Sequence, residues 1–368
     1  MVRPGNQVSL SVLIAGGGTG GHLYPGIAVG REVIARVPDA KVAFVGTTSG
    51  IEARVIPREG FALDTIRSAG LKGKSPLALA RGIALLPASA LDAWRVISKR
   101  RPVVVIGVGG YSSGPVVFLA AMRGIPTLLM EQNAMPGLTN RLLARVVKAA
   151  AVTYEESARF FRGRAFVAGN PVRPEFFGGG DDEHSSPPGA ARILVFGGSQ
   201  GAHAINVAMV EAASRLAAAA PGLAITHQTG ERDVEMVRNG YRRAGIEARV
   251  EPFLFAIDRE MKTADLVVCR AGATTLAELT AAGRPSILIP LPTATDDHQR
   301  KNADALVTHG AARMIDQRSL TGELLASQIV ALAANQAERD SISAAARRMA
   351  KPDAAKVIVD RILELAGK

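Results

Sequence analysis

The chain has 368 residues, of which 48% are hydrophobic and 4% aromatic, and its formal net charge is +11. This length allows two domains that each bury a core, and the shortage of aromatic residues disfavours a base-stacking surface. The single cysteine, Cys269, excludes an intramolecular disulfide and a thiolate metal cluster, so we expect a reducing compartment. The positive charge favours an anionic partner, for which a nucleic acid, an acidic membrane surface and a phosphorylated substrate all qualify.

Short β-branched runs alternate along the chain with Ala-, Leu- and Arg-rich segments of helical length. The predicted strands begin at residues 11, 41, 102, 127, 192, 224, 265 and 286. Strands that alternate with helices predict an α/β protein with parallel sheets, whose ligands bind at the carboxyl ends of the strands. The first apolar stretch breaks into glycines too early for a signal peptide, and no run of about 18 apolar residues occurs, so we expect neither export nor a membrane span.

One stretch divides the chain nearly in half. Residues 176–191 combine Gly, Pro, Ser and acidic residues without periodicity, which is typical of a linker. Each half then opens alike, with an apolar strand that runs into a glycine-rich loop. We therefore expect one domain over residues 1–175 and a second over 192–349, both doubly wound and facing a cleft. The amphipathic C-terminal helix, within 350–368, is expected to pack back on the first domain.

The first glycine loop, GGGTGGH at residues 16–22, leads from a strand into a helix. Such a turn gathers backbone N–H groups at the positive end of a helix dipole, where an anion can bind. The spacing also satisfies the GxGxxG pattern of dinucleotide sites, but the second strand ends in Thr47 and Thr48, where a ribose-binding acid is required. His22 is either a general base kept neutral by the helix dipole or a helix-start residue bonded to backbone.

A second informative stretch covers residues 264–303. It contains a buried strand, the small-residue turn RAGATT, and Glu278 slightly more than one turn into the following helix. The turn can receive a diphosphate, and a carboxylate beyond it can accept from both hydroxyls of a ribose. Glu278 is alternatively a first-turn acid that complements the helix dipole. The later DDHQRKNA offers polar groups to sugar hydroxyls, unless it is a solvated loop.

The segment of residues 71–101 mixes apolar residues with cations. The apolar set is Leu77, Leu79, Ile83, Leu85, Leu86 and Trp94, and the cations are Lys72, Lys74, Arg81, Arg95, Lys99, Arg100 and Arg101. Apolar side chains beside clustered cations are typical of a helix that lies on an anionic membrane surface. The alternative is a core helix with a solvated basic face.

Seven motifs occur in order: GGGTGGH, GVGGYSSGP, EQNAMPGLTN, GNPVR, GGSQGA, CRAGATTLAE and DDHQRKNA. With them the chain closely resembles the MurG family from the first strand to the last helix. The resemblance implies the GT-B fold, two Rossmann-like domains, and a peripheral enzyme on the cytoplasmic face of the bacterial inner membrane. It implies UDP-N-acetylglucosamine as donor, undecaprenyl-diphosphate-linked muramoyl pentapeptide as acceptor, and no nucleic-acid partner. Transfer inverts the anomeric centre in that family.

The resemblance also implies roles for individual residues. Thr19, Gly20 and Gly21 approach the donor, and His22, from its position at the start of the helix, is our candidate for the catalytic base. Asn133, Arg173 and Ser199 contact the donor as well, and Leu254, where the family often has isoleucine, lies near the uracil. The diphosphate and ribose are held by Ala273, Thr274, Thr275, Leu276, Ala277 and Glu278, and Gln299 reads the sugar hydroxyls.

We expect no cofactor and metal-independent catalysis, because the acidic pairs Asp181–Asp182 and Asp296–Asp297 do not form a DxD motif. Two other enzyme classes stay open. One is a GT-B transferase with another lipid acceptor, such as diacylglycerol. The other, less favoured because of the missing ribose acid, is a dinucleotide-dependent oxidoreductase.

Overall fold

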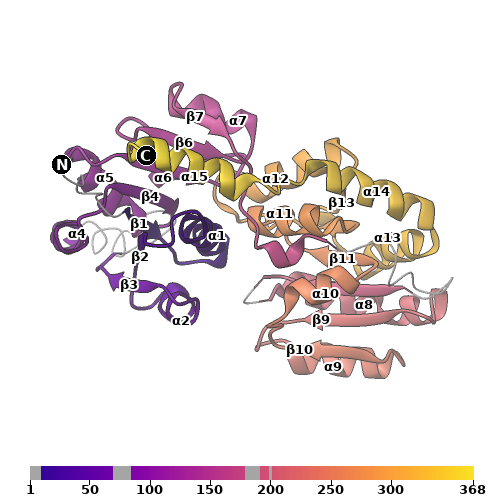
Figure 1. Cartoon of the computed structure of the whole chain (residues 1–368). Helices are drawn as coiled ribbons and strands as arrows, with labels where there is room; N and C mark the ends of the chain where they lie inside the picture. The colour runs from indigo at the N-terminus through magenta and orange to yellow at the C-terminus, as the bar shows by residue number, and fades with distance from the viewer. Residues whose placement is uncertain (1–9, 69–83, 179–190, 199–200) are drawn as a thin grey trace, which may run out of the picture. The chain divides into compact units, whose positions relative to one another are not determined.

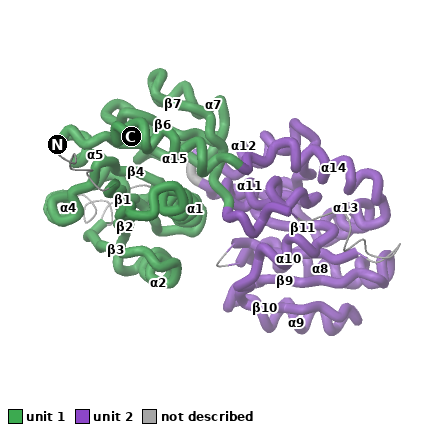
Figure 2. The backbone as a smooth tube through the Cα atoms, in the orientation of Figure 1, with its two compact units in different colours: residues 1–172, 353–368 green, residues 173–352 purple. Residues whose placement is uncertain are grey.

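The computed structural model describes residues 10–68, 84–178, 191–198 and 201–368. The chain divides into two compact units (Figure 2), which are residues 1–172 with 353–368, and residues 173–352. The division therefore falls after Val172, where we expected residue 175, and the C-terminal helix belongs to the first unit. Most of the expected linker, residues 179–190, lies outside the described residues, but Phe176 at its start is buried in the second unit.

The first unit is built on a parallel sheet of seven described strands in the order β3-β2-β1-β4-β5-β6-β7. The strands are β1 (Ser11–Gly16), β2 (Lys41–Gly46), β3 (Ala62–Thr65), β4 (Val104–Gly109), β5 (Thr127–Glu131), β6 (Ala149–Val152) and β7 (Ala165–Val167). The order reverses between β1 and β4, which makes their carboxyl ends the topological switch point of this sheet.

Helices cover both faces of this sheet (Figure 1). They are α1 (Gly20–Arg36), α2 (Glu52–Arg58), α4 (Leu86–Arg100), α5 (Ser113–Met122), α6 (Leu138–Leu143), α7 (Glu155–Ala158), η1 (Arg159–Phe161) and α15 (Ala354–Leu365). Successive residues of β1 point to opposite faces, so Ile14 packs with α1 and α15 while Leu13 packs with α4 and α5. An ion pair between Arg36 and Asp360 also joins α1 to α15.

The second unit repeats this plan with six described parallel strands in the order β10-β9-β8-β11-β12-β13. They are β8 (Arg192–Phe196), β9 (Ala224–Gln228), β10 (Ala248–Glu251), β11 (Leu266–Cys269), β12 (Ser286–Leu288) and β13 (Arg313–Met314). The switch point of this sheet lies between β8 and β11. In both units the glycine-rich loop predicted from the sequence follows the strand at the switch point.

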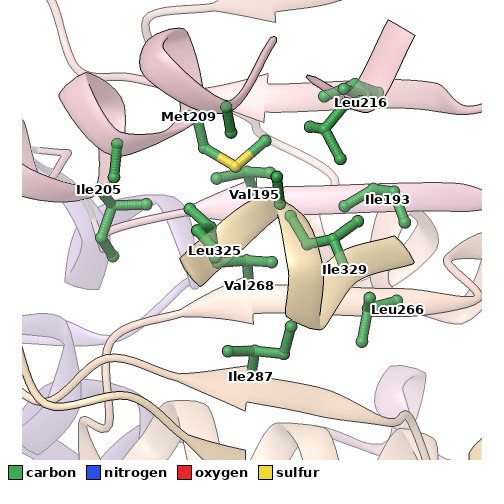
Figure 3. Packing of buried hydrophobic residues seen from close by; sticks show 14 of the residues in the cluster. Ile193, Val195, Ile205, Met209, Leu216, Leu266, Val268, Ile287, Leu325 and Ile329 are labelled. Atoms are coloured by element: carbon green, nitrogen blue, oxygen red, sulfur yellow. The ribbon is translucent and has the colours of Figure 1, made fainter. Parts of the chain in front are cut away.

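An apolar cluster lies on the sheet of the second unit, and it includes residues from some of the unit's helices. The helices of this unit are η2 (Pro174–Phe176), α8 (His203–Ala219), α9 (Val234–Arg243), α10 (Ile257–Thr263), α11 (Ala273–Ala282), η3 (Thr295–Asp297), α12 (His298–Thr308), η4 (Gln317–Ser319), α13 (Gly322–Ala334) and α14 (Gln336–Met349). Figure 3 shows Met209 of α8 and Leu325 and Ile329 of α13 over Val195 and Val268 of the central strands. Burial on this scale fixes the loops at the ends of β8 and β11.

All eight predicted strands are present, as β1, β2, β4, β5, β8, β9, β11 and β12, and the predicted α/β class with two parallel doubly wound sheets is confirmed. The sequence did not predict β3, β6, β7, β10 or β13. Four of these are edge strands, which are short and partly polar, and β6 reads AAAV, which lacks the bulky β-branched residues of a typical strand. Among the described residues, no helix is both long enough and apolar enough to cross a bilayer.

Candidate functional site

The two glycine loops of the first unit meet at its switch point. The N–H of Gly17 donates to the carbonyl of Gly109 at 3.4 Å, so the loops after β1 and β4 are in direct backbone contact. A Cβ added to Gly110, whose φ is +81°, would lie 2.4 Å from the Gly17 carbonyl oxygen. Glycine is required there because no side chain fits between the loops.

A carboxylate of the protein itself occupies the first glycine loop. Glu52, the first residue of α2, is 1% exposed and accepts from the N–H of Gly18 at 2.8 Å and from the N–H of Thr47 at 2.8 Å. Desolvation raises the pKa of this carboxyl, but these hydrogen bonds outweigh it and hold the pKa below its usual value. An ionised carboxylate therefore takes the Gly18 amide that a dinucleotide phosphate needs, which disfavours a cofactor at this loop.

His22 lies in the first turn of α1, which begins after Thr19 and includes Gly20 and Gly21. The imidazole is half-buried, and its Nδ1 lies 3.1 Å from Oε1 of Gln132 at the end of β5. A Cβ on Gly109 would lie 2.8 Å from the same nitrogen, so the ring packs against the bare backbone at the end of β4. His22 is thus held by contacts from two other strands rather than by its own helix alone.

The loop after β5 is organised by a second buried carboxylate. Glu131 is 3% exposed and accepts from the backbone N–H and the Nδ2 of Asn133, from the N–H of Gly137 and from Nδ2 of Asn140, at 2.9 to 3.1 Å. Both carboxylate oxygens are therefore engaged within the loop. Asn133, which the resemblance assigns to donor binding, is fixed by Glu131.

In the second unit, Gln228 connects the loops at the sheet's carboxyl edge. Its Nε2 donates to the carbonyl of Gly198 at 2.7 Å, and its Oε1 accepts from the N–H of Leu254 at 3.4 Å. Leu254, the residue assigned to the uracil, is itself buried, whereas the flanking Phe253 and Phe255 are exposed and stack edge to face. Ser199, assigned to the donor, lies outside the described residues.

The turn after β11 opens α11 with Gly272 as its N-cap, and Gly272 has no side chain to cap the first N–H groups. Ala273, Thr274 and Thr275 supply the backbone of that first turn. This is the uncapped, positive helix end expected of an anion site. Leu276, Ala277 and Glu278 complete the second turn of the same helix.

The structure brings Arg173 and Glu278 into one electrostatic environment. Burial raises the pKa of the Glu278 carboxyl to about 7, an effect that the Arg173 guanidinium opposes and the nearby Asp258 reinforces. Arg173 immediately precedes η2, which packs on α10 and α11. Glu278 is therefore not an ordinary solvated first-turn acid, and its charge changes close to neutral pH.

Gln299 lies in the first turn of α12, and a hydrogen bond from the backbone orients its side chain. Its Oε1 accepts from the N–H of Leu291, after β12, at 3.0 Å. Asn302, one turn further on, is fully buried and donates to the carbonyl of Ala271 at 3.4 Å. These bonds join α12 to the loops after β11 and β12, so that Gln299 lies at the same edge of the sheet as Leu254 and the start of α11.

Four residues at these sites were not singled out from the sequence: Glu52, Glu131, Gln132 and Gln228. Each of them forms hydrogen bonds with residues that are distant in sequence or with the backbone of a loop, and the sequence alone does not show these contacts. Gln132 and Glu131 lie within the EQN motif, which was the available signal for both. Within the ranges that the structure describes, no three His, Cys, Asp or Glu side chains are grouped to hold a metal ion.

Comparison with known families matches the two units separately. Residues 12–152 match the glycosyltransferase family 28 N-terminal domain, and residues 192–358 match the glycosyltransferase family 28 C-terminal domain. The solved structure titled Acinetobacter baumannii MurG aligns with a TM-score of 0.76 at 30% identity, covering 96% of this chain and 99% of that chain. A UDP-GlcNAc 2-epimerase from Neisseria meningitidis, 13% identical with a TM-score of 0.68, shares the fold alone.

Two curated relatives extend the match over nearly the whole chain. A protein of Anaeromyxobacter sp. (strain Fw109-5) is 50% identical over 98% of this chain and 94% of its own length, and one of Myxococcus xanthus (strain DK1622) is 46% identical over 97% and 93%. Both are named UDP-N-acetylglucosamine–N-acetylmuramyl-(pentapeptide) pyrophosphoryl-undecaprenol N-acetylglucosamine transferase. The chain belongs to glycosyltransferase family 28 and, within it, to the MurG family of N-acetylglucosamine transferases.

Proposed function

We propose that this enzyme transfers N-acetylglucosamine from UDP-N-acetylglucosamine to the 4-hydroxyl of undecaprenyl-diphosphate-linked muramoyl pentapeptide, a step of peptidoglycan synthesis. The relatives' shared name supports both substrates. The observation that supports a site for the donor is the carboxyl edge of the second sheet, where Gln228 binds the backbone of Leu254 and where α11 begins without a side-chain cap, one turn before Glu278. An oxidoreductase is excluded by the family match.

In the proposed mechanism, the 4-hydroxyl oxygen attacks the anomeric carbon while the bond from that carbon to the diphosphate breaks. UDP leaves from the opposite face, so the configuration inverts. His22 accepts the hydroxyl proton through Nε2, because Nδ1 faces Gln132. The charge that develops on the diphosphate is stabilised by the first N–H groups of α11 and by Arg173.

The transfer assay uses the full-length protein with radiolabelled UDP-N-acetylglucosamine and a water-dispersible form of the lipid-linked acceptor. We expect UDP release in equal amount to labelled disaccharide product, and much slower turnover with UDP-glucose. A parallel reaction offers diacylglycerol as acceptor. Transfer to diacylglycerol without transfer to the muramoyl acceptor would assign the protein to the alternative lipid-acceptor class.

Metal removal is expected to leave turnover unchanged. Protein cations and helix-end N–H groups stabilise the leaving diphosphate in the proposed mechanism, so no metal ion is required for that role. The measurement compares the initial rate of desalted enzyme with and without EDTA. A collapse of the rate that magnesium or manganese restores would contradict this expectation.

We also propose that α4 and α5 bind the cytoplasmic face of the inner membrane, where the acceptor's lipid resides. These two helices pack together and expose Leu91, Trp94, Phe118 and Met122. Arg123, which directly follows α5, has its guanidinium 4.5 Å from the centre of the Trp94 ring. Exposed apolar side chains beside cations suit an anionic bilayer surface. The earlier part of the expected membrane segment, residues 71–83, lies outside the described residues.

Replacing Leu91 and Trp94 together with serine is expected to weaken binding to phosphatidylglycerol vesicles by about tenfold or more, because both insert apolar surface into the headgroup region. Vesicle cosedimentation measures the effect. Ile34→Ser on α1 is the matched control, since Ile34 is also an exposed aliphatic residue of the first unit. If the wild type, the Leu91 and Trp94 double variant and Ile34→Ser all bound the vesicles equally, α4 would face solvent in the working enzyme.

A further inference from the structure

The hydrogen bonds of Gln132 determine which way its side-chain amide faces. Nε2 of Gln132 lies 3.2 Å from the carbonyl oxygen of Val108, in the neighbouring strand β4. A carbonyl oxygen can only accept, so the NH₂ group must face Val108 and the amide oxygen must face the opposite way. That oxygen, Oε1, lies 3.1 Å from Nδ1 of His22. Gln132 is 2% exposed, so water cannot readily replace either partner.

An amide oxygen accepts hydrogen bonds and donates none, so the contact is a hydrogen bond only if Nδ1 of His22 carries a proton. A neutral imidazole has one N–H and one unprotonated nitrogen. With the proton on Nδ1, Nε2 holds the lone pair. The chain from Val108 through Gln132 to His22 therefore selects one of the two neutral tautomers, as the orienting partner does in other histidine-based catalytic sites.

We infer that Gln132 is a positioning residue that fixes the neutral tautomer and the ring orientation of His22, so that Nε2 is the nitrogen that takes the substrate proton. This inference rests on the proposed role of His22 as base. Gly109 contributes by leaving room for the ring, since a Cβ there would lie 2.8 Å from Nδ1. Gln132 does not touch substrate in this account and acts through His22.

The group that faces Nδ1 of His22 is the neutral side-chain amide of Gln132. A carboxylate in place of the amide would stabilise the imidazolium and raise the pKa of His22. The carboxylates on the adjoining elements are Glu52 on α2 and Glu131 on β5. Glu52 accepts from the N–H groups of Gly18 and Thr47, and Glu131 accepts from the N–H of Gly137 and Nδ2 of Asn140. Among the described residues, Tyr24 follows His22 by two positions on α1, and Tyr111 follows Gly109 by two positions after β4. With an amide in that place, the contact adds no charge beside the imidazole.

The test reads the tautomer directly, in the full-length protein without substrate. Protein labelled with ¹⁵N-histidine is examined at pH 8 by long-range ¹H–¹⁵N correlation, and the signals of His22 are assigned by their loss in His22→Ala. We expect a protonated, pyrrole-type Nδ1 and an unprotonated, pyridine-type Nε2 in the wild type. In Gln132→Leu we expect the proton to redistribute to Nε2 in a substantial part of the population.

Ser157→Ala is the matched control, because Ser157 is a buried residue that donates to the carbonyls of Asn133 and Ala134 in the loop after β5. It removes hydrogen bonds from the same loop without touching His22, so the wild-type tautomer should persist. A wild-type protein with the proton on Nε2, or an unchanged pattern in Gln132→Leu, would overturn the inference.

Kinetics give an independent readout. Gln132→Leu should lower kcat by about 10- to 10²-fold with KM for UDP-N-acetylglucosamine within about twofold. Gln132→Glu retains an acceptor for Nδ1, so it should keep the tautomer and move the acidic limb of the kcat/KM profile upward by about one pH unit or more. An unmoved limb would argue against the contact. Loss of all transfer in the wild type would instead refute the proposed function, whereas the tautomer result is independent of it.

Discussion

Replacing His22 with alanine is expected to lower kcat by about 10²- to 10⁴-fold, which is the usual contribution of a positioned general base. The muramoyl hydroxyl is a weak nucleophile until its proton is removed, and we propose that the imidazole at the start of α1, which Gln132 contacts at Nδ1, removes it. The dissociation constant of UDP-N-acetylglucosamine should stay within about twofold, since the groups proposed to bind its uracil, ribose and diphosphate belong to the unit of residues 173–352. Initial transfer rates and calorimetric titration measure the two effects.

His309→Ala serves as the control for this substitution. His309 is an exposed histidine that follows the last residue of α12 and contacts the backbone of Ala305, and no role at the site is assigned to it. It should retain the wild-type rate. If His22→Ala also retained a rate within about threefold of wild type, another group would have to carry the proton, and the assignment of the base would be wrong.

Replacing Glu278 with glutamine is expected to weaken binding of UDP-N-acetylglucosamine by roughly 10- to 10²-fold. In the proposed complex the carboxylate accepts from both ribose hydroxyls, and hydrogen bonds to a charged group contribute about 1.5 to 3 kcal/mol each. Glutamine keeps the shape of the side chain but offers one neutral acceptor. Glu235→Gln, an exposed substitution on α9 of the same unit, is the matched control and should bind as the wild type does.

The raised pKa of Glu278 predicts how the affinity for UDP-N-acetylglucosamine and the folding stability change with pH. Burial raises the pKa of Glu278 to about 7, and only the carboxylate accepts from both hydroxyls. Wild-type affinity should therefore increase as the pH rises from 6 to about 8, whereas Glu278→Gln should show a flat profile. The folding stability of the unliganded protein should instead decrease as the pH rises. Its folded state keeps a proton that the unfolded state releases, so this residue lowers stability as the pH rises from the ordinary carboxyl pKa towards 7.

A wild-type affinity that does not change between pH 6 and pH 8 would mean that the Glu278 carboxyl does not bind the ribose. Titration of UDP-N-acetylglucosamine is preferred to UDP, because UDP has a terminal phosphate that itself titrates in this range. Thermal unfolding of unliganded wild type and Glu278→Gln between the ordinary carboxyl pKa and pH 7 measures the stability effect separately from the binding effect.

The sequence predicted the fold from features that act locally. Buried parallel strands such as Val104–Gly109 are continuous apolar runs, and a glycine loop after a strand identifies the place where the backbone must stay bare. Edge strands such as Arg313–Met314 gave no such signal, because their residues need not be apolar on both faces.

The site was predicted less completely, for a physical reason. His22 and Glu278 are recognisable in sequence because each lies at a fixed distance from a glycine turn. Gln132 and Gln228 are not, because their importance comes from partners 110 and 26 residues away in the chain. The glycine loop of the first unit also differs from its sequence-based interpretation, since Glu52 occupies the amide where an external anion was one expectation. Only the fold brings α2 to that loop.

The central claim is that the carboxyl edge of the second sheet holds the nucleotide sugar while the first unit supplies the base. Hydrogen exchange of the full-length protein, with and without UDP-N-acetylglucosamine, tests it most directly. The account predicts slowed amide exchange over residues 271–278 and at Leu254, with the β1–α1 loop at residues 16–22 changing less. Slowed exchange confined to residues 16–22, with 271–278 unaffected, would contradict it.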